Sequence, residues 1–384
     1  MALMALHRAV TDAFRRIPRG AVRYYTALGF WLAATAMHIP DGYLSPLTSA
    51  VMFAAMMPFW YFGLKKMRGT IDARSAPLIA LLAAFSFIVM MFNIPLPGGT
   101  TGHAVGGALL AILLGPEVAC IAVSIALIIQ AFFFGDGGIL AIGANCFNMA
   151  VVLPYVSYAV YQAAGGKQPV DSPRRAGAAF AGGYVGLTAA AFFAGIEFGI
   201  QPVLFHAVDG TPLYAPYPLS VAIPAMVIPH MLIASVVEGL VTSLVILYLQ
   251  RTNREILGMA VHPEASVESG GIRRLRGLWV ALAILAFLAP IGLLAPGTAW
   301  GEWGSGQLVR LGLSFIPQGL TQLEGLWGAP LRGYDLPFLG NANLGYIISA
   351  IVGIVVIAIV TWLFITVLTS SRPDDRRDQT KSHS

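Results

Sequence analysis

The chain has 384 residues, of which 57% are hydrophobic and 11% are charged, and its formal net charge is +5. A soluble globular domain carries about 25% charged residues, so this composition excludes a water-soluble protein and indicates an integral membrane protein. The positive charge does not indicate nucleic-acid binding, because the lysines and arginines follow a membrane topology, as described below. We therefore expect the lipid bilayer, and no nucleic acid, as a partner.

The first 36 residues have the pattern of an export signal. Five arginines precede a short apolar run at residues 24–32, and Ala34-Thr35-Ala36 matches a small-x-small cleavage site. The apolar run is shorter than the roughly 20 residues that span a bilayer. We therefore predict a signal peptide that is cleaved after Ala36, which makes Met37 the N-terminus. An uncleaved anchor, or an extension from a misassigned start codon, is the alternative.

Apolar runs of spanning length alternate with loops over the rest of the chain. They predict nine membrane helices, at about residues 47–64, 76–92, 103–114, 118–134, 139–162, 177–200, 220–248, 277–295 and 343–369. The third is short, and Gly115-Pro116 can break it. We expect an all-α membrane protein with three parts: a seven-helix domain at 37–250, a cytoplasmic linker at 251–276, and a two-helix domain at 277–384 with an outer loop and a cytoplasmic tail.

Lysine and arginine predict the orientation of these helices. Sixteen of them fall in loops of one parity, whereas only Arg310 and Arg332 fall on the opposite side. Cytoplasmic loops carry an excess of lysine and arginine. The mature N-terminus is therefore expected outside the cell and Ser384 in the cytoplasm.

Two histidines far apart in sequence fall on the outer side of this topology. His38 follows Met37, and His103 ends a Pro/Gly-rich loop. If Met37 is N-terminal, its amine, the His38 amide nitrogen and the His38 imidazole can close two fused chelate rings, and His103 can add a fourth nitrogen. Square-planar nitrogen donors suit Ni(II) or Cu(II), and Co(II) is possible. The pattern predicts a metal site at Met37, His38 and His103; the alternative is that each histidine is only a polar anchor at the membrane interface.

Four more polar residues are candidates for supporting this site from a second layer: Asp136, Asn145, His230 and Glu238. Asp136 lies at an outer turn, and His230 and Glu238 are eight residues apart on one helix face. Carboxylates inside a membrane are functional candidates by default. A purely structural hydrogen-bond network is the alternative for the pair. The chain contains no G-x-x-x-x-G-K-[ST] motif, so it does not bind ATP through a P-loop.

Three motifs in order resemble the cobalt/nickel substrate-binding membrane component of energy-coupling-factor transporters. They are MHIPDGYLSP from Met37, PLPGGTTGHAVGGALLAILLGP from Pro95 and FGDGGILAIGANCFNMA from Phe134. The resemblance covers residues 37–250. It implies that the Met37 amine, the backbone and side chain of His38, and His103 bind Ni(II) or Co(II) as the transported substrate, at the outer face and without an organic cofactor.

The resemblance also implies the partners and the location. The chain is expected in a bacterial or archaeal cell membrane, with a transmembrane coupling subunit and a pair of cytoplasmic ATPases, and to have no enzymatic activity of its own. The two helices after Arg276 resemble the small auxiliary subunit of such systems, here fused in one chain. The Pro40-Asp41-Gly42 form is more similar to the nickel-type members. Many members begin directly at Met-His, so the 36-residue extension departs from the family pattern.

Two other functions remain open. A stand-alone secondary divalent-metal permease would need no ATPase but would need a path of intramembrane carboxylates, for which the spans offer only Glu197 and Glu238. A membrane enzyme with a metal cofactor would need three ligands, an open position and a nearby general base. Four nitrogens in a square leave no such position.

Overall fold

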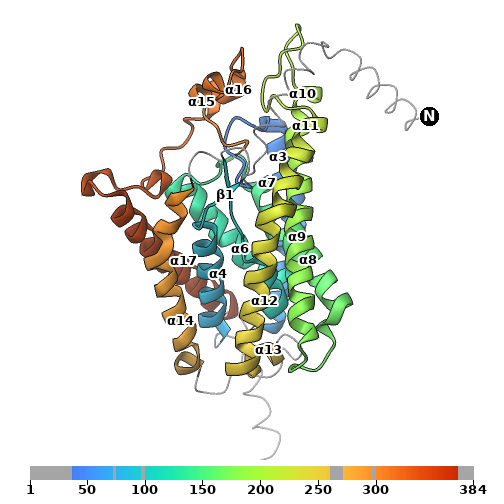
Figure 1. The fold of residues 1–384 in the computed structure, drawn as a ribbon, viewed down its shortest axis with the longest axis vertical. Helices are drawn as coiled ribbons and strands as arrows, with labels where there is room; N and C mark the ends of the chain where they lie inside the picture. The colour runs from blue at the N-terminus through green and yellow to red at the C-terminus, as the bar shows by residue number, and fades with distance from the viewer. Residues whose placement is uncertain (1–36, 72–74, 97–99, 260–270, 296–299, 371–384) are drawn as a thin grey trace, which may run out of the picture.

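A computed structural model describes residues 37–71, 75–96, 100–259, 271–295 and 300–370. The predicted signal peptide at 1–36 and its cleavage site lie outside the described residues, as do residues 260–270 of the predicted linker and the predicted cytoplasmic tail. Long helices run side by side along the longest axis of the molecule (Figure 1). The chain is an all-α membrane protein, as the apolar runs predict. By length and composition, six helical segments of the described chain could cross a membrane: Pro46–Thr70, Pro116–Phe134, Arg174–Leu204, Leu219–Thr252, Leu275–Leu294 and Ala342–Ser370.

The N-terminal helices form one bundle. In chain order they are α3 Pro46–Thr70, α4 Ala76–Met90, α5 Gly107–Leu114, α6 Pro116–Ile129, η2 Gln130–Phe134, α7 Ile142–Cys146, η3 Phe147–Val152, α8 Leu153–Tyr161, η4 Gln162–Gly166, α9 Arg174–Gly199, α10 Gln201–Leu204, α11 Leu219–Pro229, η5 His230–Ala234, α12 Ser235–Thr252 and α13 Arg254–Met259. Helix α3 begins where the MHIPDGYLSP motif ends. Ser45 caps this helix by accepting from the Thr48 N–H at 3.0 Å, and Pro46 occupies its first turn.

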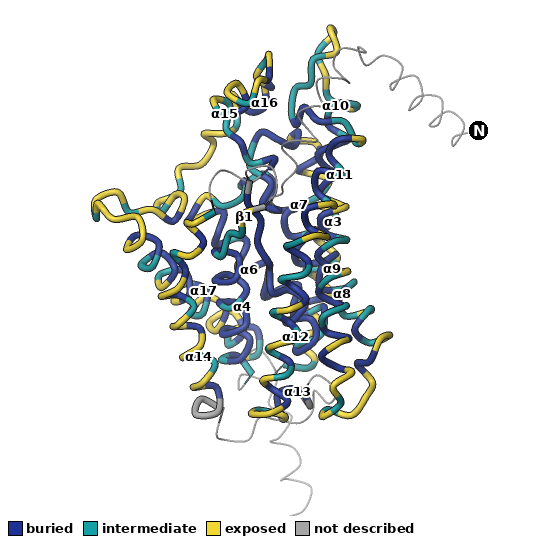
Figure 2. Tube along the Cα trace, in the orientation of Figure 1, coloured by how far each residue is buried: buried dark blue, intermediate teal, exposed yellow. Residues whose placement is uncertain are grey.

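Two predicted spans differ from the observed elements. The span predicted at 103–114 is preceded by an antiparallel hairpin, β1 Ile94–Leu96 and β2 Thr100–Gly102, and becomes helical only at α5. Gly106, at φ +75°, provides a left-handed turn before α5. The span predicted at 139–162 consists of α7, the wider π-helical turn η3, and α8. Figure 2 shows β1 and α7 at the upper end of a buried interior.

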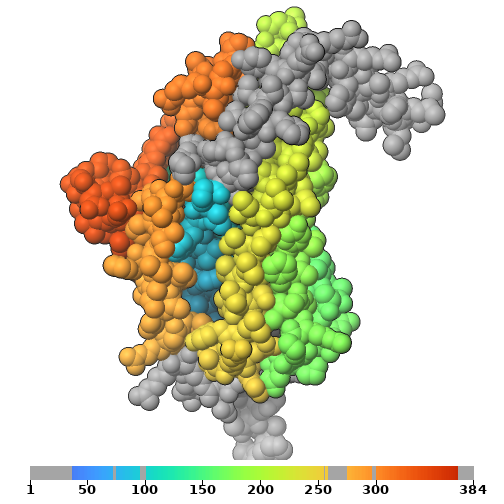
Figure 3. Space-filling model, in the orientation of Figure 1, coloured from blue at the N-terminus to red at the C-terminus, as the bar shows by residue number. Residues whose placement is uncertain are grey.

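The C-terminal part adds two long helices and an outer segment. Its elements are α14 Gly271–Leu288, η6 Ala289–Leu294, α15 Ser305–Arg310, α16 Gln318–Leu323, η7 Arg332–Tyr334, η8 Pro337–Leu339 and α17 Ala342–Ser370. Both long helices pack against α4, and Figure 3 shows α14 along one flank of α4. Gly353 permits close approach of α17, because a Cβ there would overlap the Phe87 ring. Residues 300–341, named the outer segment after the predicted topology, lie at the end of the bundle that carries β1 and α7 (Figure 1).

Candidate metal site

His38 and His103 meet inside one end of the bundle. They are 65 residues apart in sequence, yet His38 Nδ1 lies 3.1 Å from His103 Nε2. Both side chains are buried, with 2% and 6% of their surface exposed. Two ligands in adjacent corners of a square, each with a metal–nitrogen bond of about 2.0–2.1 Å, would lie about 2.8–3.0 Å apart. The observed spacing is therefore close to that of two nitrogens that share one metal ion.

The His103 ring presents a lone pair toward His38. Its Nδ1 lies 3.0 Å from the Ala104 carbonyl oxygen; because a carbonyl only accepts, this nitrogen carries the ring proton and Nε2 is free to accept or to ligate. Residues 103–106 form the loop between β2 and α5, outside the spanning helices. Burial lowers the pKa of His103 to about 4, and the neighbouring His38 adds to this effect. The imidazole is therefore neutral, the form that binds metals.

The backbone on either side of His38 is held by the FGDGG motif and the helix after it. Asn145 clamps Ile39: its Oδ1 accepts from the Ile39 N–H at 2.8 Å, and its Nδ2 donates to the Ile39 carbonyl at 3.1 Å. Asp41 accepts from the N–H groups of Ile139 and Leu140 at 2.9 and 2.8 Å. The two motifs thus bind each other through their backbones, and Asn145 acts on the site by fixing the chain next to His38.

The backbone after His103 is held by Glu238, which lies on α12. Its carboxylate accepts three hydrogen bonds, from the N–H groups of Val105 and Gly106 at 2.8 Å each and from Ala108 at 3.1 Å. A carboxylate at a helix N-terminus satisfies donors that the helix leaves unpaired. Glu238 therefore fixes the loop that carries His103. The Nδ1 of His230 lies 2.7 Å from the Met226 carbonyl oxygen of the same helical segment, so its hydrogen bond does not reach the His38–His103 pair.

Replacing Glu238 tests whether this anchor matters for the site. We expect Glu238→Gln to lower stability by about 2–4 kcal/mol, because one amide oxygen cannot replace a carboxylate that accepts three bonds. Metal affinity is expected to fall about 10–100-fold, the usual effect of removing a residue that orients a ligand. Thermal unfolding in detergent and metal titration measure the two effects. Glu117→Gln, at the start of α6 and remote in the described contacts, is the control; equal effects in both variants would contradict the anchoring role.

Asp136 contacts His38 directly. Its Oδ1 lies 3.3 Å from His38 Nδ1, and its Oδ2 accepts from the Tyr334 hydroxyl and, at 3.3 Å, from Gln130 Nε2. The sequence predicts a supporting role for Asp136, and in the structure Asp136 contacts His38 directly. Tyr334 comes from the outer segment of the C-terminal part, and its backbone is left-handed at φ +61°, a strained conformation for a tyrosine that the surrounding contacts must hold.

Glu302 also reaches the site, and the sequence analysis missed it. It lies in the outer segment, where the backbone N–H of His38 favours the charged form of its carboxylate. The nearest ligand atoms of His38, Asp136 and Glu302 all lie within 4.8 Å of one another. Burial raises the pKa of Glu302 well above its usual range, and the negative field of Asp136 adds to the rise. The one signal in the sequence is WGEW at residues 300–303, an acidic residue between two tryptophans.

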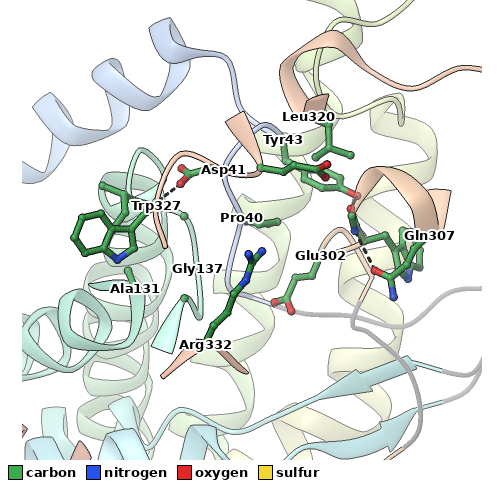
Figure 4. Close-up of a pocket in the computed structure, with 16 residues that line it drawn as sticks. Pro40, Asp41, Tyr43, Ala131, Gly137, Glu302, Gln307, Leu320, Trp327 and Arg332 are labelled. Carbon is green, nitrogen blue, oxygen red and sulfur yellow. Dashed lines mark hydrogen bonds between the residues drawn. The ribbon is translucent and has the colours of Figure 1, made fainter. Parts of the chain in front are cut away.

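A pocket lies next to this cluster. It has a volume of about 280 Å³ and is lined by the MHIPDG segment, the FGDGG turn and the outer segment, and among its lining residues are Asp41, Gly137, Glu302, Glu324 and Arg332. Figure 4 shows the side chains of Glu302 and Arg332 extending into the same space beside Pro40. Glu302 thus belongs both to the pocket and to the partly buried group of ligand atoms.

Met37 has a buried side chain, with 1% of its surface exposed. In the full chain its nitrogen is the amide that follows Ala36. An amine ligand at this position would therefore require cleavage of the bond between these two residues. His38 Nε2 is buried and has no hydrogen-bond partner among the described residues.

The chain is similar to known metal transport proteins. Residues 38–256 match the family described as cobalt uptake substrate-specific transmembrane region. Over 335 residues the chain is 50% identical to the fused nickel transport protein NikMN of Rhodobacter capsulatus, covering 84% of this chain and 95% of the relative. It is 43% identical over 329 residues to the probable fused nickel transport protein LarMN of Lactiplantibacillus plantarum, with 83% and 95% covered. A crystal structure of a truncated transition metal transporter is 51% identical, with a TM-score of 0.52, and covers 55% of this chain and 97% of that one.

Proposed function

The chain belongs to the family of cobalt uptake substrate-specific transmembrane regions, and from this premise we propose that it captures Ni(II) or Co(II) at the outer membrane face as the specificity subunit of an ATP-driven energy-coupling-factor importer. The similarities identify the chain as a membrane component for cobalt or nickel transport. The subunit would work with a transmembrane coupling subunit and a pair of cytoplasmic ATPases, because this chain has no P-loop. Nickel is the proposed preference, since both fused relatives are described as nickel transport proteins.

The proposed ligands are four nitrogens: the Met37 amine, the His38 amide, His38 Nδ1 and His103 Nε2. The single observation that carries this proposal is the 3.1 Å contact between the last two. Coordination through the His38 amide and Nδ1 closes a six-membered chelate ring, and the amine adds a five-membered ring. Nδ1 is the nitrogen that faces His103, which agrees with this ring closure. Residues 37–250 are proposed as the metal-binding domain, residues 251–276 as the linker, and residues 277–384 as a fused auxiliary domain.

The orientation is part of the proposal. Placing the mature N-terminus outside and Ser384 inside puts the site and its pocket on the outer face, and it places the lysine- and arginine-rich loops in the cytoplasm. The ion would then be captured from outside, before any step that uses ATP.

A secondary permease is the rival function, and the described contacts of its candidate carboxylates do not favour it. Glu238 accepts three backbone hydrogen bonds at the start of α5. Glu197 accepts from Asn148 Nδ2 at 2.8 Å. The two residues lie on different helices, and each is used in a structural contact, so they do not form a path for an ion.

Reconstitution distinguishes the two functions. Proteoliposomes that contain this chain, its coupling subunit and the ATPase pair are expected to take up radioactive Ni(II) only when ATP is enclosed in the lumen, where the ATPases of the molecules with an outward metal site lie. Substituting a non-hydrolysable ATP analogue is the matched control and should abolish uptake. Sustained ion-gradient-driven uptake by the chain alone would contradict the importer and favour the permease.

A further inference from the structure

The structure contains a second set of metal-binding groups that overlaps the nitrogen site but does not need the Met37 amine. His38, Asp136 and Glu302 bring one nitrogen and two carboxylates within 4.8 Å of one another. Mixed imidazole and carboxylate donors bind divalent transition metals, and carboxylates bind ions that keep part of their water shell. We propose that these three residues form a capture site, which holds the incoming divalent ion before it reaches the nitrogen donors. This inference rests on the proposed function.

Glu302 links the capture site to the outside. Its side chain lines the outward pocket of about 280 Å³ (Figure 4). Because Glu302 also belongs to the ligand group with His38 and Asp136, an ion that enters through the pocket reaches it next to His38. The carboxylate oxygens of Glu302 and Asp136 replace water molecules of the arriving ion, and these waters leave through the pocket. Exchange of ligands is the whole of this step, and no covalent bond of the protein changes.

The outer segment holds Glu302 in place by aromatic packing. Trp300 and Trp303 flank it; the Trp300 ring packs on Tyr217 with centroids 4.6 Å apart, and the Trp303 carbonyl accepts from the Tyr43 hydroxyl at 2.8 Å. Gly301 lies between them at φ +82°, and a Cβ there would approach Phe198 to 2.9 Å. A glycine is therefore needed for the turn that presents Glu302. Asp136 is held by the same segment through the hydroxyl of Tyr334.

The position of Glu302 indicates a temporary contact. Its carboxylate lies within 4.8 Å of the His38 ring nitrogen and on the side of the His38 backbone N–H, which favours its charged form. A metal bound to that amide nitrogen would replace the amide proton, which leaves to water, and would occupy the direction of the same N–H bond. Glu302 and an ion in the nitrogen square therefore compete for one place. Removing the carboxylate should change how fast the ion arrives and leave the final affinity nearly unchanged.

The first test measures rate and affinity separately on the full mature protein. Glu302→Gln keeps the shape of the side chain and one oxygen beside His38 but loses the charge and the metal affinity of a carboxylate. We expect Ni(II) association, followed by stopped-flow tryptophan fluorescence, to slow by at least about tenfold, while the equilibrium affinity changes less than about threefold, since only a transient contact is lost. Glu324→Gln removes the same charge from the same pocket; there Glu324 accepts from the Ser305 backbone and hydroxyl at 2.9 and 2.7 Å.

The control separates contact from simple attraction by charge. Association in Glu324→Gln should stay within about twofold of the wild type at physiological salt, because exposed charges are screened over about 8 Å. Equal slowing in both variants would overturn the capture site, and so would an unchanged rate in Glu302→Gln. A wild-type protein that binds neither Ni(II) nor Co(II) would refute the proposed function itself, which is a different result.

A second test detects the capture site directly and does not depend on the nitrogen square. Mn(II) prefers carboxylate and water oxygens, so it should bind the His103→Ala protein through Glu302 and Asp136. Adding Glu302→Gln to this protein should weaken Mn(II) binding by at least about tenfold, measured from the free-ion signal in electron paramagnetic resonance. Equal Mn(II) binding with and without the Glu302 carboxylate would refute the proposal.

Discussion

His103→Ala should abolish tight Ni(II) binding, with a loss of affinity of at least about a hundredfold, because removing a ligand costs no less than removing a residue that orients one. His103 supplies the lone pair that faces His38 Nδ1 at 3.1 Å, and alanine leaves that corner of the square without a donor. Isothermal titration of the purified mature protein with Ni(II) measures the change.

His206→Ala is the matched control for this variant. The His206 ring contacts the carbonyl of the next residue at 3.0 Å, as the His103 ring does, but His206 is exposed and lies outside the site. The Ni(II) affinity of the His206→Ala protein should equal that of the wild type. Thermal unfolding of both variants shows whether the fold is kept. A folded His103→Ala protein with unchanged affinity would mean that the fourth ligand lies elsewhere.

Retention of residues 1–36 should lower the Ni(II) affinity as much as His103→Ala does. If the bond before Met37 is intact, its nitrogen is an amide without the amine lone pair, and the five-membered chelate ring cannot form in the same way. We expect the uncut chain to bind Ni(II) at least about a hundredfold more weakly than the mature chain, as for the loss of any other ligand. Edman sequencing of the wild-type protein should begin at Met37.

One preparation can serve as its own control. A site for a specific protease, inserted so that the cut leaves Met37 at the N-terminus, is combined with Ala34→Phe and Ala36→Phe to block natural cleavage. Affinity should be weak before digestion and tight afterwards. Equal affinity before and after digestion would refute the amine ligand and leave the two histidines as the core of the site.

The membrane character of this protein followed from the sequence, because a segment that crosses the bilayer must be long, apolar and internally hydrogen-bonded. The same regularity made the His38–His103 pair predictable: alternation of spans assigned both residues to one side, although a topology gives no distance. The loop motif around His103 was expected to be irregular, but the β1–β2 hairpin was not, because its short strands have no periodicity that separates them from a Pro/Gly-rich loop.

The contacts of the supporting residues were only partly predictable from the sequence. Asp136 and Asn145 came from motifs near the site in sequence, and the structure gives each a contact with His38 or its neighbour. The eight-residue spacing of His230 and Glu238 suggested a pair, yet Glu238 contacts the start of α5 while His230 bonds to its own helical segment. Spacing on one helix defines a shared face, but it does not define which neighbour packs against that face.

By itself the sequence determined an all-α membrane protein and a pair of histidines on one side of it, because hydrophobic length, charge asymmetry and short motifs are properties of local stretches. Only the tertiary structure decided that Glu302 and Tyr334, from the far end of the chain, reach His38 and Asp136. These contacts depend on how α14 and α17 pack against α4 and on how two tryptophans and a left-handed glycine direct the outer segment. Hydrogen bonds between residues so distant in sequence leave no periodic pattern, so their partners are fixed only when the helices pack.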